Sequence, residues 1–159
     1  MSTAALSLLS PSEWQAVSLS LLVAGTAVAA SLPLGIGVAW LLARHNFRGR
    51  MLVELLVNLP LVLPPVVTGY LLLLTFGRNG PVGGWLHDWF GIRIVFDWTG
   101  AALAAAVVSF PLMVRAIRIA FLAVDRRLEE TARTLGASPV DTFFTVSLPL
   151  ARHGIIAGM

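Results

Sequence analysis

The chain has 159 residues, of which 57% are hydrophobic and only 12% charged, and its formal net charge is +3. Soluble domains usually carry about 25% charged residues, so this composition excludes an ordinary soluble domain and indicates an integral membrane protein. The chain has neither cysteine nor lysine, which excludes disulfides, thiolate metal sites and the lysine of a phosphate-binding loop.

The first predicted spanning helix covers about residues 16–43, a run without a charged residue. About 20 residues, each rising about 1.5 Å, cross a hydrocarbon core of about 30 Å, so this run is long enough. Ser10, Pro11 and Glu13 precede it. They have the pattern of a capping box with proline in the first turn, which predicts that the helix begins there.

The second predicted span covers about residues 55–76 and contains three prolines. Each proline lacks the backbone N–H and leaves the carbonyl four residues earlier without its helical partner. Such a break is tolerated at membrane depth only where protein buries it or where it lines a cavity. We therefore expect an interrupted span that either borders a transport path or is a packing kink without ion contact. The candidates for lining a path are Pro64, Pro65, Thr68 and Gly69.

The link at about residues 77–98 contains Gly80-Pro81, Gly83-Gly84 and three tryptophans. It is expected to be a turn-rich loop with aromatic anchors at the membrane surface.

The third predicted span covers about residues 99–120, with a kink expected near Pro111. Arg115 and Arg118 lie three residues apart and therefore on one helix face. Their position indicates the far interface of the membrane. Two interpretations stay open: the side chains extend to the aqueous boundary, or they line an exit for an anion.

The arginines predict the orientation of the chain in the membrane. Nine lie after the first span or at and beyond the far end of the third, and only Arg78 and Arg93 lie in the link between the second and third. Arginine is enriched in cytoplasmic loops, so the nine are expected in the cytoplasm and the N-terminus outside. Because these arginines cluster at the ends of apolar runs, no nucleic-acid partner is expected. The nine are Arg44, Arg48, Arg50, Arg115, Arg118, Arg126, Arg127, Arg133 and Arg152.

The stretch of about residues 125–150, called here the 125–150 element, has a helix–turn–helix pattern. A short amphipathic helix is predicted first, with an ion pair between Glu129 and Arg133. Gly136 is predicted to end it, and Ser138 to cap a second helix with Asp141 as its partner. The pattern indicates a rigid projection from the membrane on the cytoplasmic side, although an ordinary loop between spans would also fit.

The order of residues in this element resembles the EAA motif of ABC-importer permeases. The matching pieces are Glu130-Thr131-Ala132, Gly136 and Val146-Ser147-Leu148-Pro149, at the spacing of that motif. Thr131 stands where the motif has alanine, and Val146 where it has isoleucine. The resemblance implies that this element fits a groove on a separate ATPase subunit. The residues implied in coupling are Glu130, Ala132, Gly136, Leu148 and Pro149.

Further segments look like those of molybdate permeases, and the likeness runs from about Glu13 to Gly158. They are Leu59 to Tyr70, Asp88 to Ile92, Ser109 to Arg118 and Thr134 to Ala137. The resemblance implies a non-enzymatic permease subunit for molybdate in the bacterial cytoplasmic (inner) membrane. It also implies a second permease copy as a homodimer, a partner ATPase that holds the ATP, and a periplasmic or surface oxyanion-binding protein. No cofactor or metal is expected on this chain itself. Sulfate, thiosulfate and tungstate permeases are the nearest alternatives.

The expected fold class is an all-α integral membrane protein, with three spanning helices and the 125–150 element in one permease domain over residues 1–159. Permeases of this type continue through at least two more spans, so the chain is expected to be C-terminally truncated at the start of a fourth. A secondary transporter is an alternative, but it would carry ionisable residues in mid-membrane for coupling, and none is evident. A membrane anchor without a transport path is a further alternative.

Overall fold

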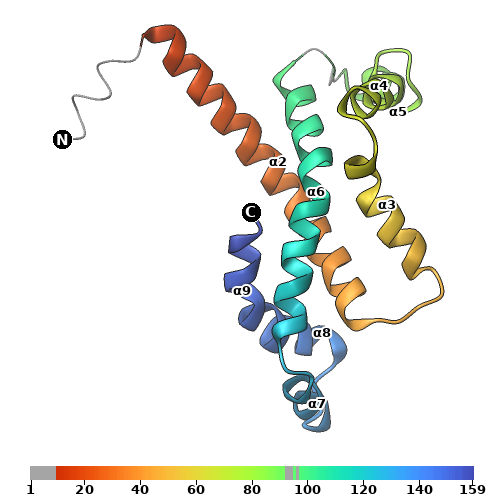
Figure 1. Ribbon diagram of the computed structural model, residues 1–159, viewed down its shortest axis with the longest axis vertical. Helices are drawn as coiled ribbons and strands as arrows, with labels where there is room; N and C mark the ends of the chain where they lie inside the picture. Colours follow the sequence, from red (N-terminus) through yellow and green to blue (C-terminus); the bar gives the residue numbers. More distant parts are fainter. Residues whose placement is uncertain (1–9, 92–94, 96) are drawn as a thin grey trace. The chain divides into compact units, whose positions relative to one another are not determined.

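The computed structural model describes residues 10–91, 95 and 97–159, and within these residues every regular element is helical (Figure 1). Ile92 and Arg93, which entered the sequence predictions, lie outside the described residues. The elements are α2 (Pro11–Arg44), α3 (Arg50–Val62), α4 (Pro65–Phe76), α5 (Pro81–Phe90), α6 (Trp98–Ala123), α7 (Arg126–Thr134), α8 (Pro139–Thr142), the π-helical turn η1 (Phe143–Ser147) and α9 (Leu148–Ala157).

Helix α2 begins where the capping box predicts. The backbone N–H of Ser10 donates to Glu13 Oε2 at 2.6 Å, and the N–H of Glu13 donates to Ser10 Oγ at 3.4 Å. The helix then runs for 34 residues and includes Pro33. Helices α2 and α6 are each long and apolar enough to cross a membrane. The first and third predicted spans are therefore confirmed as helices, and α6 continues to Ala123 rather than ending at residue 120.

The second predicted span is interrupted, as its prolines suggest, and the interruption lies at one place. Helix α3 runs past Pro60 and ends at Val62, while α4 starts at Pro65. Leu63 and Pro64 are extended, with ψ of 140° and 142°, and each precedes a proline, which disfavours helical backbone. Counted as one broken span, the pair brings the number of candidate spans to three. The chain is thus an all-α membrane protein.

The prediction of a turn-rich loop at residues 77–98 was wrong, because α5 occupies Pro81–Phe90. Pro81 lies in the first helical turn, where its missing N–H costs nothing, and Gly91 ends the helix with a positive φ of 67°. The two glycines after Pro81 do not stop this short helix. Trp85 and Trp89 lie one turn apart on it and are both exposed.

The chain divides into two compact units. One comprises the described residues of Met1–Ala30 and Pro64–Val107, and the other Ser31–Leu63 and Val108–Met159. The second unit has a continuous apolar core. Phe121 and Ile117 of α6 are fully buried in it. Its other buried members are Ala39, Leu42, Ala43, Val57, Met113, Val114, Val124, Ala151 and Ile155.

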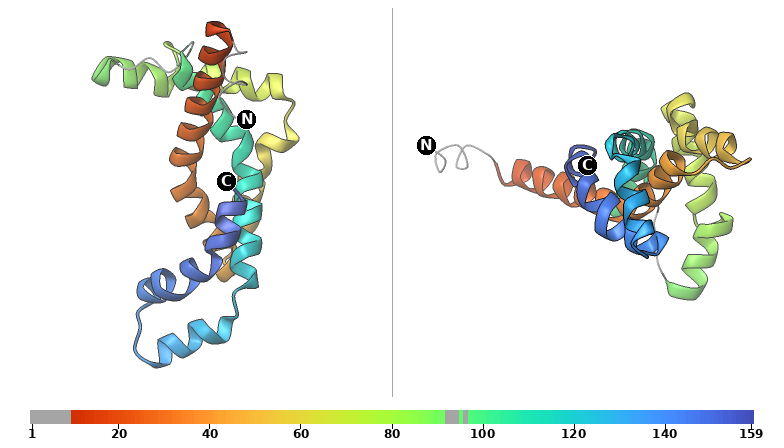
Figure 2. Two further views of the ribbon diagram at one scale, coloured as in Figure 1. Left: turned by 90° about the vertical axis from the view of Figure 1, so that its left-hand side faces the viewer. Right: turned by 90° about the horizontal axis from the view of Figure 1, so that it is seen from below.

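Within the second unit, α9 lies alongside the C-terminal half of α6 in both Figure 1 and Figure 2. Small residues allow this close approach. A Cβ added to Gly154 would overlap the Cβ of Ala120, and one added to Gly158 would lie 2.9 Å from the Cβ of Ala116. Small residues spaced four apart on both helices are typical of tightly packed helix pairs in membranes.

Candidate functional site

The first half of the 125–150 element forms the predicted short helix and ends at a glycine. The side chain of Asp125 caps α7 by accepting the N–H of Arg127 at 3.0 Å. After α7, Gly136 has a φ of +94°, the left-handed region that favours glycine. The N–H of Gly136 donates to the Arg133 carbonyl and that of Ala137 to the Ala132 carbonyl, the two bonds of a Schellman motif.

The second half begins with the predicted cap. Ser138 Oγ accepts the N–H of Asp141 at 3.1 Å, and Asp141 Oδ2 accepts the N–H of Ser138 at 3.3 Å. The prediction of helix, glycine turn and helix is therefore confirmed for this element.

A wide helical turn, η1, separates α8 from α9. The N–H of Leu148 bonds the carbonyl of Phe143, five residues earlier instead of four. Pro149 follows directly, and in a regular helix its ring would collide with the Thr145 carbonyl. The wide turn carries the chain past Pro149 without ending the helix. The Leu-Pro pair of the motif thus has a local structural consequence that the sequence did not predict.

The five residues implied in coupling lie along this element with different exposure. Glu130 on α7 and Gly136 in the turn are exposed, and Ala132 is half-buried. Leu148 packs against the core of the second unit, whereas Pro149 is exposed. Only Leu148 therefore serves the interior, and the others are available on or near the surface of the turn.

The ion pair predicted between Glu129 and Arg133 was wrong. The Oε1 atom of Glu129 lies 2.9 Å from Nη2 of Arg44, the last residue of α2, and it also accepts the hydroxyl of Ser147 at 2.6 Å. The side chains of Arg44 and Glu129 are only 7% and 12% exposed. A buried carboxylate gains more from a buried guanidinium than from an exposed neighbour on its own helix, because water screens the exposed pair.

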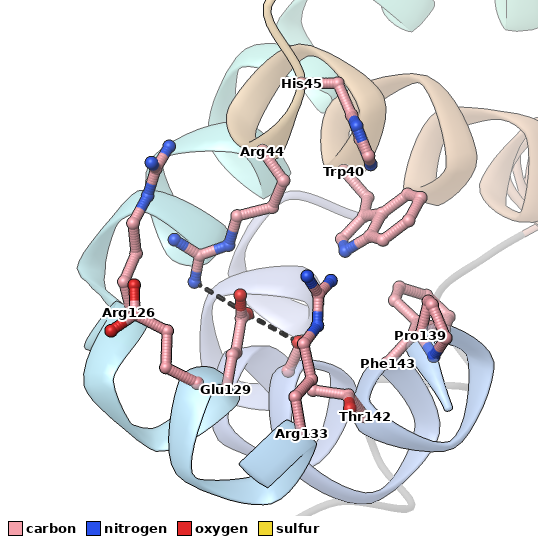
Figure 3. A pocket seen from close by; sticks show the side chains of 11 residues that line it. Trp40, Arg44, His45, Arg126, Glu129, Arg133, Pro139, Thr142 and Phe143 are labelled. Carbon is pink, nitrogen blue, oxygen red and sulfur yellow. Dashed lines mark hydrogen bonds and ion pairs between the residues drawn. The ribbon is translucent and has the colours of Figure 1, made fainter. Parts of the chain in front are cut away.

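The ion pair lies at the wall of a pocket between α2, α7, α8 and η1 (Figure 3). Arg44 Nη2 also donates to the Val124 carbonyl at 3.0 Å. Trp40 meets Phe143 edge-on, with ring centroids 5.2 Å apart, which adds an apolar contact beside the charges. Arg126, Arg133 and Glu130 also line the pocket, so its excess of positive charge is small.

The two arginines proposed for the exit both contact α3, in the same unit. Arg115 donates to Asn58 Oδ1 from Nε at 3.1 Å and from Nη2 at 2.6 Å. Arg118 forms an ion pair with Glu54 at 3.0 Å. Arg115 therefore meets a neutral amide, whereas Arg118 shares the Glu54 carboxylate with Arg50, whose Nε lies 3.2 Å from the same Oε1 atom.

The other path candidates, Pro64, Pro65, Thr68 and Gly69, belong to the first unit. Thr68 is buried, and Pro64 and Pro65 are exposed. Gly69 lines a mainly apolar pocket that also includes Asp97. The described wall of this pocket has one carboxylate and no cationic side chain. The assignment of these four residues to a transport path stays a prediction. In the part of the chain that the structure describes, no group of three or more His, Asp or Glu side chains is placed to bind a metal ion.

Sequence reasoning missed Arg44, Glu54 and Asn58. Arg44 served only as a marker of orientation, although it is the last residue of α2, and a cation is favourable at a helix C-terminus. Glu54 and Asn58 lie four apart beside an apolar run, a spacing that places two polar groups on one face. That spacing was the available signal.

Comparisons with known proteins show which proteins this chain resembles. The chain is 59% identical over 151 residues to the molybdenum transport system permease protein ModB of Escherichia coli (strain K12), covering 95% of this chain and 66% of that protein. It is 54% identical over 147 residues to ModB of Haemophilus influenzae, covering 92% of this chain and 64% of that protein. It is 38% identical over 149 residues to the sulfate transport system permease protein CysW of E. coli K12, covering 94% of this chain and 51% of that protein.

The chain thus spans slightly less than two thirds of the length of the molybdenum permeases it matches. The family model of binding-protein-dependent transport system inner membrane components matches residues 31–159, which include the whole 125–150 element. The chain belongs to the family of binding-protein-dependent transport system inner membrane components.

Proposed function

We propose that this chain is part of the permease of an ATP-driven importer that moves molybdate across the cytoplasmic membrane. The observation that carries the substrate is the contrast in identity: 59% with a molybdenum permease against 38% with a sulfate permease, over nearly the same residues. The permease does not hydrolyse ATP in this proposal, since a separate ATPase subunit holds the nucleotide. A binding protein outside the membrane selects the oxyanion, and two permease copies surround the path.

The 125–150 element is the proposed contact with the ATPase subunit. Leu135 and Val140, on either side of the Gly136 turn, are 83% and 63% exposed. Exposed apolar side chains on a capped, rigid turn favour contact with a partner protein. Replacing Leu135 by Glu is expected to abolish copurification of the ATPase, whereas Leu135→Met, which keeps the apolar volume, is expected to retain it. Equal copurification with both variants would place the docking contact elsewhere.

The proposed orientation has the 125–150 element in the cytoplasm and the N-terminus outside, because nine of the arginines then face the cytoplasm. A single cysteine at Thr134, read by a membrane-impermeant thiol reagent, tests this in a chain that has no cysteine of its own. Labelling is expected only in inverted vesicles. Labelling in intact cells would reverse the orientation.

The substrate is tested by molybdate uptake in cells that lack their own high-affinity molybdate system. The full-length permease is supplied with its ATPase and binding protein, and excess sulfate or tungstate competes. We expect uptake that resists sulfate and is lowered by tungstate. A sulfate-type permease would be favoured if excess sulfate abolished molybdate uptake, or if no molybdate uptake occurred at all.

A secondary transporter is the alternative of another class. The ATP-driven importer and the secondary transporter are distinguished by replacing the partner ATPase with a variant that binds ATP but does not hydrolyse it. Uptake is expected to cease with that variant, and uptake that continued would identify a transporter driven by an ion gradient.

A further inference from the structure

The buried ion pair between Arg44 and Glu129 joins four segments of the second unit. Arg44 is the last residue of α2, and its Nη2 contacts Glu129 Oε1 at 2.9 Å and the Val124 carbonyl at 3.0 Å. Ser147, at the end of η1, donates to the same Glu129 oxygen at 2.6 Å. The end of α2, the residue after α6, helix α7 and the end of η1 therefore meet at one carboxylate and one guanidinium. Figure 3 shows Arg44 and Glu129 directed toward each other.

Stability alone does not account for this pair. Removing both charges from water is costly, and apolar residues of similar size often stabilise a protein as well or better. The pair is also not fully satisfied, because Arg44 Nε is buried without a hydrogen-bond partner among the described residues. Because burying the two charges costs desolvation energy, the pair is better explained by the position of α7 that it specifies. Each charge is compensated only when α7 lies in this position against the end of α2.

The position of Glu129 connects this geometry to the docking surface. The side chain of Glu129 is largely buried and faces Arg44, while its neighbour Glu130, the first residue of the motif, is exposed. Helix α7 therefore has one face toward the membrane helices and one toward solvent. Arg44 ends a continuous helix of 34 residues, so a displacement of α7 that keeps the pair intact moves the end of that helix too.

We propose that Arg44 and Glu129 form an electrostatic joint that makes the 125–150 element and the end of α2 move as one body, so that Arg44 is a positioning residue for coupling. This inference rests on the proposed function, because coupling has meaning only if an ATPase acts on the element. The aromatic contact between Trp40 and Phe143 holds the same segments together, but it tolerates sliding. The ion pair is the directional contact.

The first test measures ATP hydrolysis and molybdate uptake on the full-length permease, reconstituted in proteoliposomes with its ATPase and binding protein. Glu129→Gln keeps the side-chain volume and the bond from Ser147 but removes the charge. We expect ATP hydrolysis to persist while uptake per ATP falls roughly fivefold or more, the range of typical coupling between sites. Uptake per ATP is expected to be higher in Arg44→Lys than in Arg44→Gln. It is also expected to be higher in the double variant Arg44→Glu/Glu129→Arg than in either of its single variants. Arg152→Gln, which removes the charge of an exposed arginine on α9, is the matched control.

The joint is refuted if the single variants keep the wild-type ratio, or if the swapped pair is as defective as Glu129→Arg alone. A wild-type complex without molybdate uptake would instead refute the proposed substrate.

The second test is independent of the substrate. Spin labels on cysteines at His45 and Thr134, in a chain without other cysteines, report the distance between the end of α2 and the end of α7. With the ATPase bound, the distance is expected to be the same with and without ATP, and to change with ATP only in Glu129→Gln. A wild-type distance that changed with ATP as much as the variant's would refute the joint.

Discussion

Gly154 of α9 lies directly against Ala120 of α6, so closely that a methyl group on Gly154 would overlap the alanine Cβ. This contact lets two helices approach along their small residues, and it depends on both partners being small. It leads to the first prediction, on the stability of the protein.

Replacing Gly154 by Ala is expected to destabilise the protein by about 1–3 kcal/mol, as typical overpacking does. Gly37→Ala on α2 is the matched control, because nothing lies within 4 Å of an added Cβ there. That change is expected to be neutral or to stabilise the helix by about 0.5–1 kcal/mol. Thermal unfolding of the purified full-length protein in detergent measures both, and equal shifts would contradict the close contact.

Replacing Gly136 by Ala is expected to cost about 1–2 kcal/mol, the penalty for an ordinary side chain in left-handed backbone. Space is not the reason, since a Cβ at Gly136 would meet nothing within 4 Å. Gly136→Asn is therefore expected to cost less, because asparagine tolerates this conformation. The measurement is the unfolding midpoint of both variants. If the two lost equal stability, the positive φ would not be the cause.

Removing the cap hydroxyl with Ser138→Ala is expected to destabilise the start of α8 by about 1 kcal/mol, or about fivefold in local opening. Hydrogen exchange at the amide of Asp141, which Ser138 Oγ accepts, reads this directly. Ser18→Ala is the control, since that hydroxyl only bonds the Gln15 carbonyl within α2. Unchanged exchange at Asp141 would show that the cap contributes nothing.

Neutralising Arg115 is expected to lower molybdate uptake more than neutralising Arg118, if both border the route of the anion. Among the described residues, Arg115 hydrogen-bonds the neutral side chain of Asn58, whereas Arg118 pairs with the Glu54 carboxylate, which it shares with Arg50. An anion is therefore attracted more strongly to Arg115 than to Arg118. Initial uptake rates of Arg115→Gln and Arg118→Gln are compared, with Arg115→Lys as the control that keeps the charge. Wild-type uptake by Arg115→Gln would mean that this side chain only extends to the membrane boundary.

Local structure could be predicted wherever neighbouring residues determine it. The cap at Ser10, the break before Pro65, the turn at Gly136 and the cap at Ser138 each depend on residues within about four positions, and all are present. The exception is α5. The glycines within this segment predicted a loop. Pro81 at the start of α5 and Gly91 at its end are helix signals, and the segment is helical.

The sequence by itself determined that the protein is helical, apolar enough for a membrane, interrupted in its second span and equipped with a capped turn after its third. These properties follow from composition, run length and local backbone chemistry. Only the tertiary structure decided which partners meet across the chain: Glu129 with Arg44 instead of Arg133, Arg115 with Asn58, and Gly154 with Ala120. The physical reason is that a charged or small side chain on a helix has several acceptable partners, and the packing of distant helices selects among them.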